Sequence, residues 1–283
     1  MKPPPFDYYA PTTLDDALTL LEELGEDAKP LAGGQSLVPL MNFRLAWPAA
    51  LIDLNRVPGL DGVRTQDGVL TIGAMARQAD VERSEDTRAG WPLVGEALRH
   101  VGHLATRSRG TVGGSLAHAD PAAELPAVLL ALRGEVVATS RRGTRRITAD
   151  ELFVGFFSTV LEPGELLTEI RLPAAAAGSG SAFVELARRF GDFALAGVAV
   201  SVGPDGAGIA LCGASGRPLR ARRAEEALAA DATPDDVGRL AAEEAEPQGD
   251  IHGDVEYRRE LVRVLTRRAV ETARERARVD GRG

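Results

Sequence analysis

Two short glycine-rich segments are the clearest candidates for chemistry in this sequence. Residues 32–37 are AGGQSL and residues 111–116 are TVGGSL, so each has paired glycines followed by polar and apolar residues. Glycine has no Cβ, so its backbone N–H groups can turn toward an anion, and nearby hydroxyls add donors. Neither segment has the G-x-G-x-x-G spacing or a Walker lysine. The two loops could hold a diphosphate from two sides; the alternative is that each glycine pair only makes a tight turn.

Two carboxylates follow the second glycine pair. In HADPAAELPA, residues 118–127, Asp120 and Glu124 are four positions apart around a proline. Pro121 suits the first turn of a helix, which makes Asp120 the expected N-cap. Glu124 would then lie one turn into the helix, where its carboxylate can accept hydrogen bonds from ribose hydroxyls. The alternative is a helix cap followed by a solvated glutamate, and for Asp120 taken alone it is favoured.

Apolar spacing and turn residues outline the elements that must position these loops. A helix is predicted over 13–25, with Thr13 as its cap and Gly25 at its end. Further helices are predicted over 91–102, 221–231, 235–246 and 254–278, and within 111–132. Strands are predicted over 29–33, 49–54, 68–75, 181–189 and 194–214, and a hairpin over 134–153. Strands and helices mix without strict βαβ alternation, so we predict an α+β fold.

A segment of small residues, PAAAAGSGSA at 173–182, predicts a linker between two domains. The first domain is expected to cover 1–176, and it contains both glycine pairs. The second, over 177–283, is expected to be a smaller domain of one sheet and several helices.

Composition limits the possible functions. The chain has 283 residues, 44% of them hydrophobic, and a formal net charge of −8, which argues against broad contact with nucleic-acid phosphates. No apolar run is long enough for a membrane span, and the N-terminus lacks a signal-peptide core, so we expect a cytoplasmic protein. The single cysteine, Cys212, cannot form an internal disulfide or hold an iron–sulfur cluster. The four histidines show no metal-binding spacing, and no metal is expected.

Five segments in this order resemble one known family. They are FDYYAPTTLDDALTLL, PLAGGQSLVPLMNFRL, RGTVGGSLAHADPAAELPA, EPGELLTEIRLP and YRRELVRVLTRRAV. Together they resemble the FAD-binding medium subunit of molybdenum hydroxylases, the carbon monoxide dehydrogenase and xanthine dehydrogenase family. The resemblance runs from about Pro5 to about Val270, and the two glycine loops are its most specific part.

The resemblance implies a FAD-binding domain of the vanillyl-alcohol-oxidase (PCMH) type, built from two subdomains. A carbon monoxide dehydrogenase flavoprotein C-terminal domain would follow it. The glycine loops would bind the FAD diphosphate, and Glu124, where many members have aspartate, would contact the ribose. Leu166 and Leu167 match a segment beside the flavin or adenine, and Phe193 is the expected aromatic neighbour of the isoalloxazine ring. The implied cofactor-binding residues are Ala32, Gly33, Gly34, Gln35, Ser36, Leu37, Thr111, Val112, Gly113, Gly114, Ser115, Asp120, Glu124, Leu167 and Phe193.

The implied function is electron transfer within a complex. A large molybdopterin-binding subunit and a small [2Fe–2S] subunit would supply the centres that this chain lacks, in a heterotrimer that itself dimerises. Electrons would pass through FAD to an acceptor, and no catalytic residue is expected on this chain. The resemblance leaves the substrate open among carbon monoxide, purines, heteroaromatics and aldehydes, and the acceptor open among NAD⁺, oxygen and quinones. The alternatives are a stand-alone FAD-dependent oxidase and a non-enzymatic nucleotide-binding or assembly protein.

Overall fold

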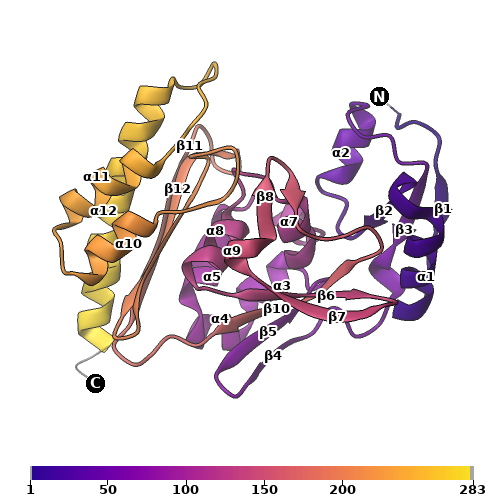
Figure 1. Cartoon of the computed structure of the whole chain (residues 1–283), viewed down its shortest axis with the longest axis horizontal. Helices are drawn as coiled ribbons and strands as arrows, with labels where there is room; N and C mark the ends of the chain where they lie inside the picture. The colour runs from indigo at the N-terminus through magenta and orange to yellow at the C-terminus, as the bar shows by residue number, and fades with distance from the viewer. Residues whose placement is uncertain (1, 281–283) are drawn as a thin grey trace.

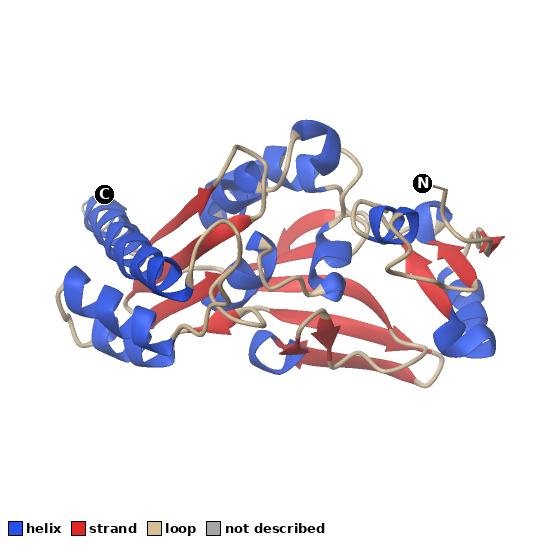
Figure 2. Cartoon of the chain, turned by 90° about the horizontal axis from the view of Figure 1, so that it is seen from above, coloured by secondary structure: helices blue, strands red, loops and turns tan. Residues whose placement is uncertain are grey.

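Three blocks of secondary structure follow one another along the chain in the computed structural model, which describes residues 2–280. In Figure 1 the N-terminal block lies at the right, the central block in the middle and the C-terminal block at the left. Figure 2 shows that each block combines strands with helices that cover them. The prediction of an α+β fold is confirmed. None of the helices within 2–280 combines the length and the apolar character needed to cross a membrane.

The N-terminal block is a small parallel sheet with strand order β1-β3-β2. Its elements are β1 (Asp7–Tyr9), α1 (Leu14–Leu24), the 3-10 turn η1 (Gly25–Asp27), β2 (Ala28–Leu31), α2 (Leu37–Asn42), β3 (Ala50–Asp53) and η2 (Leu54–Arg56). The predicted cap is confirmed: the Thr13 hydroxyl accepts from the backbone N–H of Asp16 at 3.1 Å, and Gly25 ends the helix with φ +60°. The first glycine loop, residues 32–37, therefore begins at the carboxyl end of a parallel strand, the usual side for ligands in such sheets.

The central block has a five-stranded antiparallel sheet with strand order β4-β5-β10-β6-β7. The strands of this sheet are β4 (Val63–Gln66), β5 (Val69–Gly73), β6 (Glu135–Ser140), β7 (Gly143–Thr148) and β10 (Leu166–Pro173). A separate two-stranded sheet is formed by β8 (Phe153–Gly155) and β9 (Ser158–Thr159). Its helices are α3 (Gln78–Arg83), α4 (Glu85–Gly90), α5 (Pro92–His100), α6 (Leu104–Arg107), α7 (Val112–His118), α8 (Glu124–Ala131) and α9 (Ala149–Leu152). The predicted hairpin is confirmed as β6 and β7.

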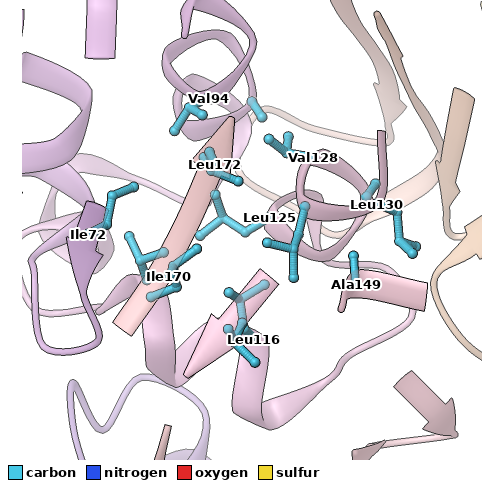
Figure 3. Close-up of a cluster of buried hydrophobic side chains, with 14 of the residues drawn as sticks. Ile72, Val94, Leu116, Leu125, Val128, Leu130, Ala149, Ile170 and Leu172 are labelled. Carbon is cyan, nitrogen blue, oxygen red and sulfur yellow. The ribbon is translucent and has the colours of Figure 1, made fainter. Parts of the chain in front are cut away.

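The core of the central block lies between this sheet and its helices. Ile72 and Ile170 from the sheet meet Leu116 from α7 and Leu125 and Val128 from α8 (Figure 3). Every residue of α8 is buried, because the helix packs against α5, α7 and α9 of the central block and against β12, β13 and β14 of the C-terminal block. Helix α8 is thus the central element of the structure.

The C-terminal block is an antiparallel sheet with strand order β11-β12-β13-β14 and three helices. Its elements are β11 (Gly180–Ala187), β12 (Ala194–Gly203), β13 (Gly206–Cys212), β14 (Leu219–Arg220), α10 (Arg222–Ala229), α11 (Pro234–Glu244) and α12 (Val255–Asp280). The helices predicted here are confirmed, and they cover the outer face of the sheet (Figure 1).

Strand β13 divides its side chains between two cores. Ile209 and Leu211 face α10–α12, whereas Ala210 and Cys212 face α8. A Cβ built on Gly208 would lie 2.0 Å from the backbone oxygen of Ala131 at the end of α8. Small residues therefore allow the sheet to approach the α8 backbone directly.

The segment after the second glycine pair differs from the prediction. Two helices form instead of one, separated at Ala119, which has φ +52°. Asp120 does not cap α8: its carboxylate accepts from the N–H of Ala122 at 2.9 Å, and the N-cap is Ala123. The carbonyl of Pro121 accepts from the N–H of Gly213 of the C-terminal block at 2.8 Å, and within the described residues it has no helical partner. Glu124 is consequently the first residue of α8, and not one turn in.

Replacing Gly208 by alanine should destabilise the protein by about 1–3 kcal/mol, because the new methyl group would force β13 away from α8. Urea denaturation measures the loss. Gly216→Ala is the matched control, since a Cβ there meets nothing within 4 Å. Equal stabilities of the two variants would contradict the direct contact between β13 and α8.

Candidate cofactor site

A cavity of about 550 Å³ lies between the N-terminal and central blocks, and both glycine loops line it. The predicted site residues that line it are Ala32, Gly33, Gly34, Gln35, Ser36, Leu37, Thr111, Gly113, Gly114, Ser115, Asp120, Glu124, Leu167 and Phe193. Val112 is the exception, because its side chain is buried in the core of the central block. The fold therefore brings nearly all of the predicted residues to one cavity.

The first glycine loop packs against the residues just before the second loop. A Cβ on Gly33 would lie 2.3 Å from the carbonyl oxygen of Arg109 and 2.8 Å from Cα of Gly110. A Cβ on Gly113 would lie 2.7 Å from Cα of Ala74, at the end of β5. These glycines are required by backbone packing inside the protein, whatever the cavity binds.

A chain of polar contacts fixes the separation of the loops. Asn55 donates from Nδ2 to the carbonyl of Ala32 at 3.0 Å. Asn55 also accepts, through Oδ1, from the guanidinium of Arg77 at 2.5 Å. The same guanidinium donates to the carbonyl of Arg109. Asn55 and Arg77 thus join the backbone of the first loop to the residues just before the second.

The loops differ in the hydrogen-bond donors that they offer. Within residues 2–280, the backbone N–H groups of Gly33 to Ser36 have no protein acceptor. In the second loop, Val112, Gly113 and Ser115 donate to backbone carbonyls, and Gly114 donates to the Thr111 hydroxyl. The first loop therefore offers backbone donors, whereas the second, residues 111–115, can add mainly its serine hydroxyl.

Buried acids lie beside the second loop. Burial raises the pKa of Glu124 to about 7, although the charge of Arg107 opposes the shift. Glu185 lies behind it, on β11, and burial together with the charge of Glu124 raises its pKa to about 8. Nδ1 of His100 is 3.9 Å from Glu185, and burial lowers the pKa of this imidazole. The contact between His100 and Glu185 therefore joins two uncharged groups at neutral pH.

Cys212 lies in the same buried region. A Cβ on Gly197 would lie 2.5 Å from its sulfur and 3.6 Å from the Glu185 side chain. Burial and the neighbouring acids raise the pKa of the thiol well above its ordinary value. The thiolate form needed for reaction or metal binding is disfavoured, so Cys212 acts as a small core residue.

Phe193 lines the cavity, and three more exposed phenylalanines lie near it in the chain or on its wall residues; we call Phe156, Phe157, Phe190 and Phe193 the aromatic rim. Phe193, 69% exposed, lines the mouth, and Phe190 lies against His103 with ring centroids 5.8 Å apart. Phe157 has φ +49° and stacks on His118 at 4.8 Å. Leu167 is buried in the inner wall. The cavity thus has an apolar wall, a polar floor and an aromatic rim.

The sequence and the fold of this chain match those of known FAD-binding proteins. Residues 4–175 match the family described as "FAD binding domain in molybdopterin dehydrogenase", and residues 181–273 match "CO dehydrogenase flavoprotein C-terminal domain". The 6-hydroxypseudooxynicotine dehydrogenase complex subunit alpha of Paenarthrobacter nicotinovorans is 43% identical, over 98% of this chain and 97% of that protein.

Caffeine dehydrogenase subunit beta of Pseudomonas sp. (strain CBB1) is 41% identical, over 98% of this chain and 97% of that protein. The structure of carbon monoxide dehydrogenase from Hydrogenophaga pseudoflava, in a form lacking the Mo-pyranopterin moiety, superposes with a TM-score of 0.95. It shares 39% identity and covers 98% of this chain and 99% of that chain. The chain belongs to the FAD-binding subunits of the molybdenum hydroxylases.

The donors in the cavity fit the cofactor of this family, FAD. Its diphosphate needs several hydrogen-bond donors, and the first loop presents unpartnered N–H groups at Gly33 to Ser36. Lys29 is the one cationic side chain among the residues of 2–280 that line the cavity. Within this cavity, neutral dipoles, and not a cluster of cations, are thus the main groups available for holding the diphosphate.

Several residues of the cavity wall have no local sequence pattern that predicts them. Gln78, Val101, Gly102 and Thr106 line the cavity, although they belong to helix termini and a turn with no recognisable motif. They reach the cavity because α3 and the segment before α6 pack behind the second loop. A tertiary contact of this kind leaves no pattern in neighbouring residues.

Replacing Glu185 by glutamine should stabilise the apo-subunit at pH 8–9 by on the order of a few kcal/mol, since one pKa unit corresponds to about 1.4 kcal/mol. The folded-state pKa of Glu185 is raised from 4.5 to about 8, so ionisation costs stability as the pH rises through this interval. The variant should therefore show a shallower fall in stability between pH 5 and 8. Urea denaturation at several pH values measures both effects.

Glu23→Gln, an exposed position on α1, is the control and should leave the pH dependence unchanged. If Glu185→Gln and the wild type lose stability with the same slope, Glu185 does not titrate in this interval.

Proposed function

We propose that this subunit carries electrons from an iron–sulfur centre on a partner subunit, through FAD, to an external acceptor. The supporting observation is a cavity that combines unpartnered backbone donors with an open aromatic rim. The chain has a single cysteine, which lies buried in β13, so it cannot hold an iron–sulfur cluster itself. The relatives described above are likewise named as subunits of dehydrogenases.

In this proposal the residues of the chain bind and orient the cofactor. The N–H groups of Gly33 to Ser36 and the hydroxyls of Ser36 and Ser115 donate to the diphosphate oxygens. Glu124 accepts from ribose hydroxyls, and Leu167 and Phe193 flank the flavin ring. Bound FAD supplies a centre that accepts two electrons and can pass them on singly. The substrate reaction takes place on a partner, and no catalytic residue is assigned here.

We propose two partners, a large molybdopterin-binding subunit and a small [2Fe–2S] subunit, in a heterotrimer that itself dimerises. The small subunit would dock at the aromatic rim, because electron transfer requires its cluster to lie near the flavin. Phe156, Phe157, Phe190 and Phe193 are exposed there beside the cavity. Exposed apolar patches of this kind are typical of protein interfaces. Substrate selection would belong to the large subunit.

We also propose a domain boundary between residues 176 and 177. Residues 174–179 lie outside the strands that end at Pro173 and begin at Gly180. The two family matches end and begin on either side of this segment, at 175 and 181.

Replacing Ser36 by alanine should weaken FAD binding by about 2- to 12-fold, the effect of one net hydrogen bond of about 0.5–1.5 kcal/mol. The stability of the apo-subunit should not change, because the Ser36 hydroxyl has no protein partner within residues 2–280.

Gly33→Ala should lose both FAD affinity and stability, since its Cβ would meet the Arg109 carbonyl. Flavin fluorescence titration and urea denaturation measure the two quantities.

Ser201→Ala, on β12 of the C-terminal block, is the matched control and should leave FAD affinity unchanged. Unaltered affinity in Ser36→Ala would remove this hydroxyl from the proposed site.

The isolated subunit, saturated with FAD, should be reduced by dithionite but should oxidise no substrate of the family. Substrate-dependent reduction of an artificial dye should appear only after the small and large subunits are added. The flavin should be released on acid denaturation, because neither glycine loop has a cysteine or histidine for covalent attachment and Cys212 is buried in the core. Turnover by the chain alone would instead establish a stand-alone oxidase.

A further inference from the structure

Helix α2 is an apolar helix that the rest of the chain leaves largely uncovered. Its sequence is LVPLMN, and Met41 is its only buried residue. Within residues 2–280, α2 packs closely against no other helix or strand. It lies at the top of the N-terminal block in Figure 1, at the edge of the molecule. A helix that is apolar on every side is normally buried, so α2 lacks the surface that would cover it.

The turn after α2 adds three large apolar side chains to this surface. Phe43, Leu45 and Trp47 are 69%, 73% and 64% exposed, and we call these three residues the α2 patch. The turn is held in place, because the N–H of Leu45 donates to the carbonyl of Leu40 at 2.8 Å and Nε1 of Trp47 donates to the carbonyl of Arg44 at 2.7 Å. Exposed apolar side chains that gather in one place, aromatic ones above all, are typical of protein interfaces.

A cleft of about 630 Å³ adjoins α2, and we call it the second cleft. Val38, Pro39 and Asn42 of α2 line it, together with Arg77 and Arg109. The backbone of the first glycine loop lines both the second cleft and the cavity proposed for FAD. The α2 patch therefore continues into a concave surface on the far side of this loop.

The unpaired charges beside the α2 patch are positive. Within residues 2–280, the guanidinium groups of Arg44 and Arg109 form no hydrogen bond or ion pair, and only their carbonyls accept hydrogen bonds from side chains. Asp53 is the one carboxylate among the described residues that line the second cleft, and it already accepts from Tyr8 and Asn55. Apolar side chains next to unpaired cations are complementary to a partner surface that combines apolar side chains with carboxylates.

We propose that the α2 patch and the second cleft form the docking surface for the large subunit of the complex, which rests on the proposed function above. The small subunit is placed there at the aromatic rim, which lies beside the first cavity. The α2 patch lies beside the second cleft instead, with the first glycine loop between the two cavities. One partner for each surface accounts for both. Carboxylates of the large subunit would pair with Arg44 and Arg109.

The test is photo-crosslinking in the assembled complex of three subunits, with p-benzoylphenylalanine in place of Leu45. The Leu45 side chain is mostly exposed, so the probe should not disturb the fold. Light should crosslink position 45 to the large subunit. The same probe in place of Phe156, on the aromatic rim, is the matched control and should crosslink to the small subunit.

A second measurement does not depend on the probe. The double variant Phe43→Ser, Leu45→Ser should bind the purified large subunit about 30-fold more weakly or worse, as expected for the loss of interface hot spots. Its thermal stability and FAD affinity should equal those of the wild type, because both side chains are exposed. Ile251→Ser, at a residue that is 94% exposed in the C-terminal block, is the control and should leave binding of the large subunit unchanged.

Crosslinks from position 45 to the small subunit, to a second copy of this chain or to neither would overturn the proposal. Wild-type affinity of the double variant for the large subunit would overturn it as well. Failure of the wild-type chain to assemble with either partner would instead defeat the proposed function, so the two failures are distinguishable.

Discussion

The contact between the first glycine loop and the residues just before the second is the constraint on which the rest of the structure depends. The backbone at Arg109 and Gly110 fills the space where a side chain at position 33 would lie. This contact sets the width of the cavity, because the N-terminal block forms one wall and the central block the other. The parallel sheet carries the first loop to it, and Asn55 and Arg77 tie it in place. The paired glycines are therefore as much a packing requirement as a binding one.

The two glycine loops contribute in different ways to an anion site that has acidic neighbours. The first loop leaves its N–H groups unpaired, whereas the second uses its own to anchor itself to β5 and to its helix. The rigid second loop can thus support the donors of the first. Burial raises the pKa of Glu124 to about 7 and that of Glu185 to about 8, so both acids carry less negative charge near neutral pH than ordinary glutamates, which reduces their repulsion of a diphosphate. Backbone dipoles and partly protonated acids together favour an anion in this cavity without a cluster of cations lining it.

Much of the fold could be predicted because its causes lie within a few residues. Thr13 caps α1, and the turn between β6 and β7 follows from neighbouring residues. The glycine motifs also predicted two of the segments that line the cavity. The error at Asp120 lies where the chain meets a distant part of the sequence: Gly213 of the C-terminal block donates to the carbonyl of Pro121, and α8 begins only at Glu124. Gln78 was missed for the same reason, because only the packing of α3 behind the second loop brings it to the cavity.

The small residues on the side of the C-terminal sheet that faces α8 determine how the protein would respond to cleavage of its backbone. Strands β12 and β13 share a hydrophobic core with α8. The C-terminal block therefore packs tightly against the central block and is not an independent domain joined only by a linker. A protease that nicked the segment 174–179 would break one covalent link and leave this interface intact. The two fragments would then migrate as one particle until denatured. The segment that divides the sequence is therefore not a point of mechanical weakness.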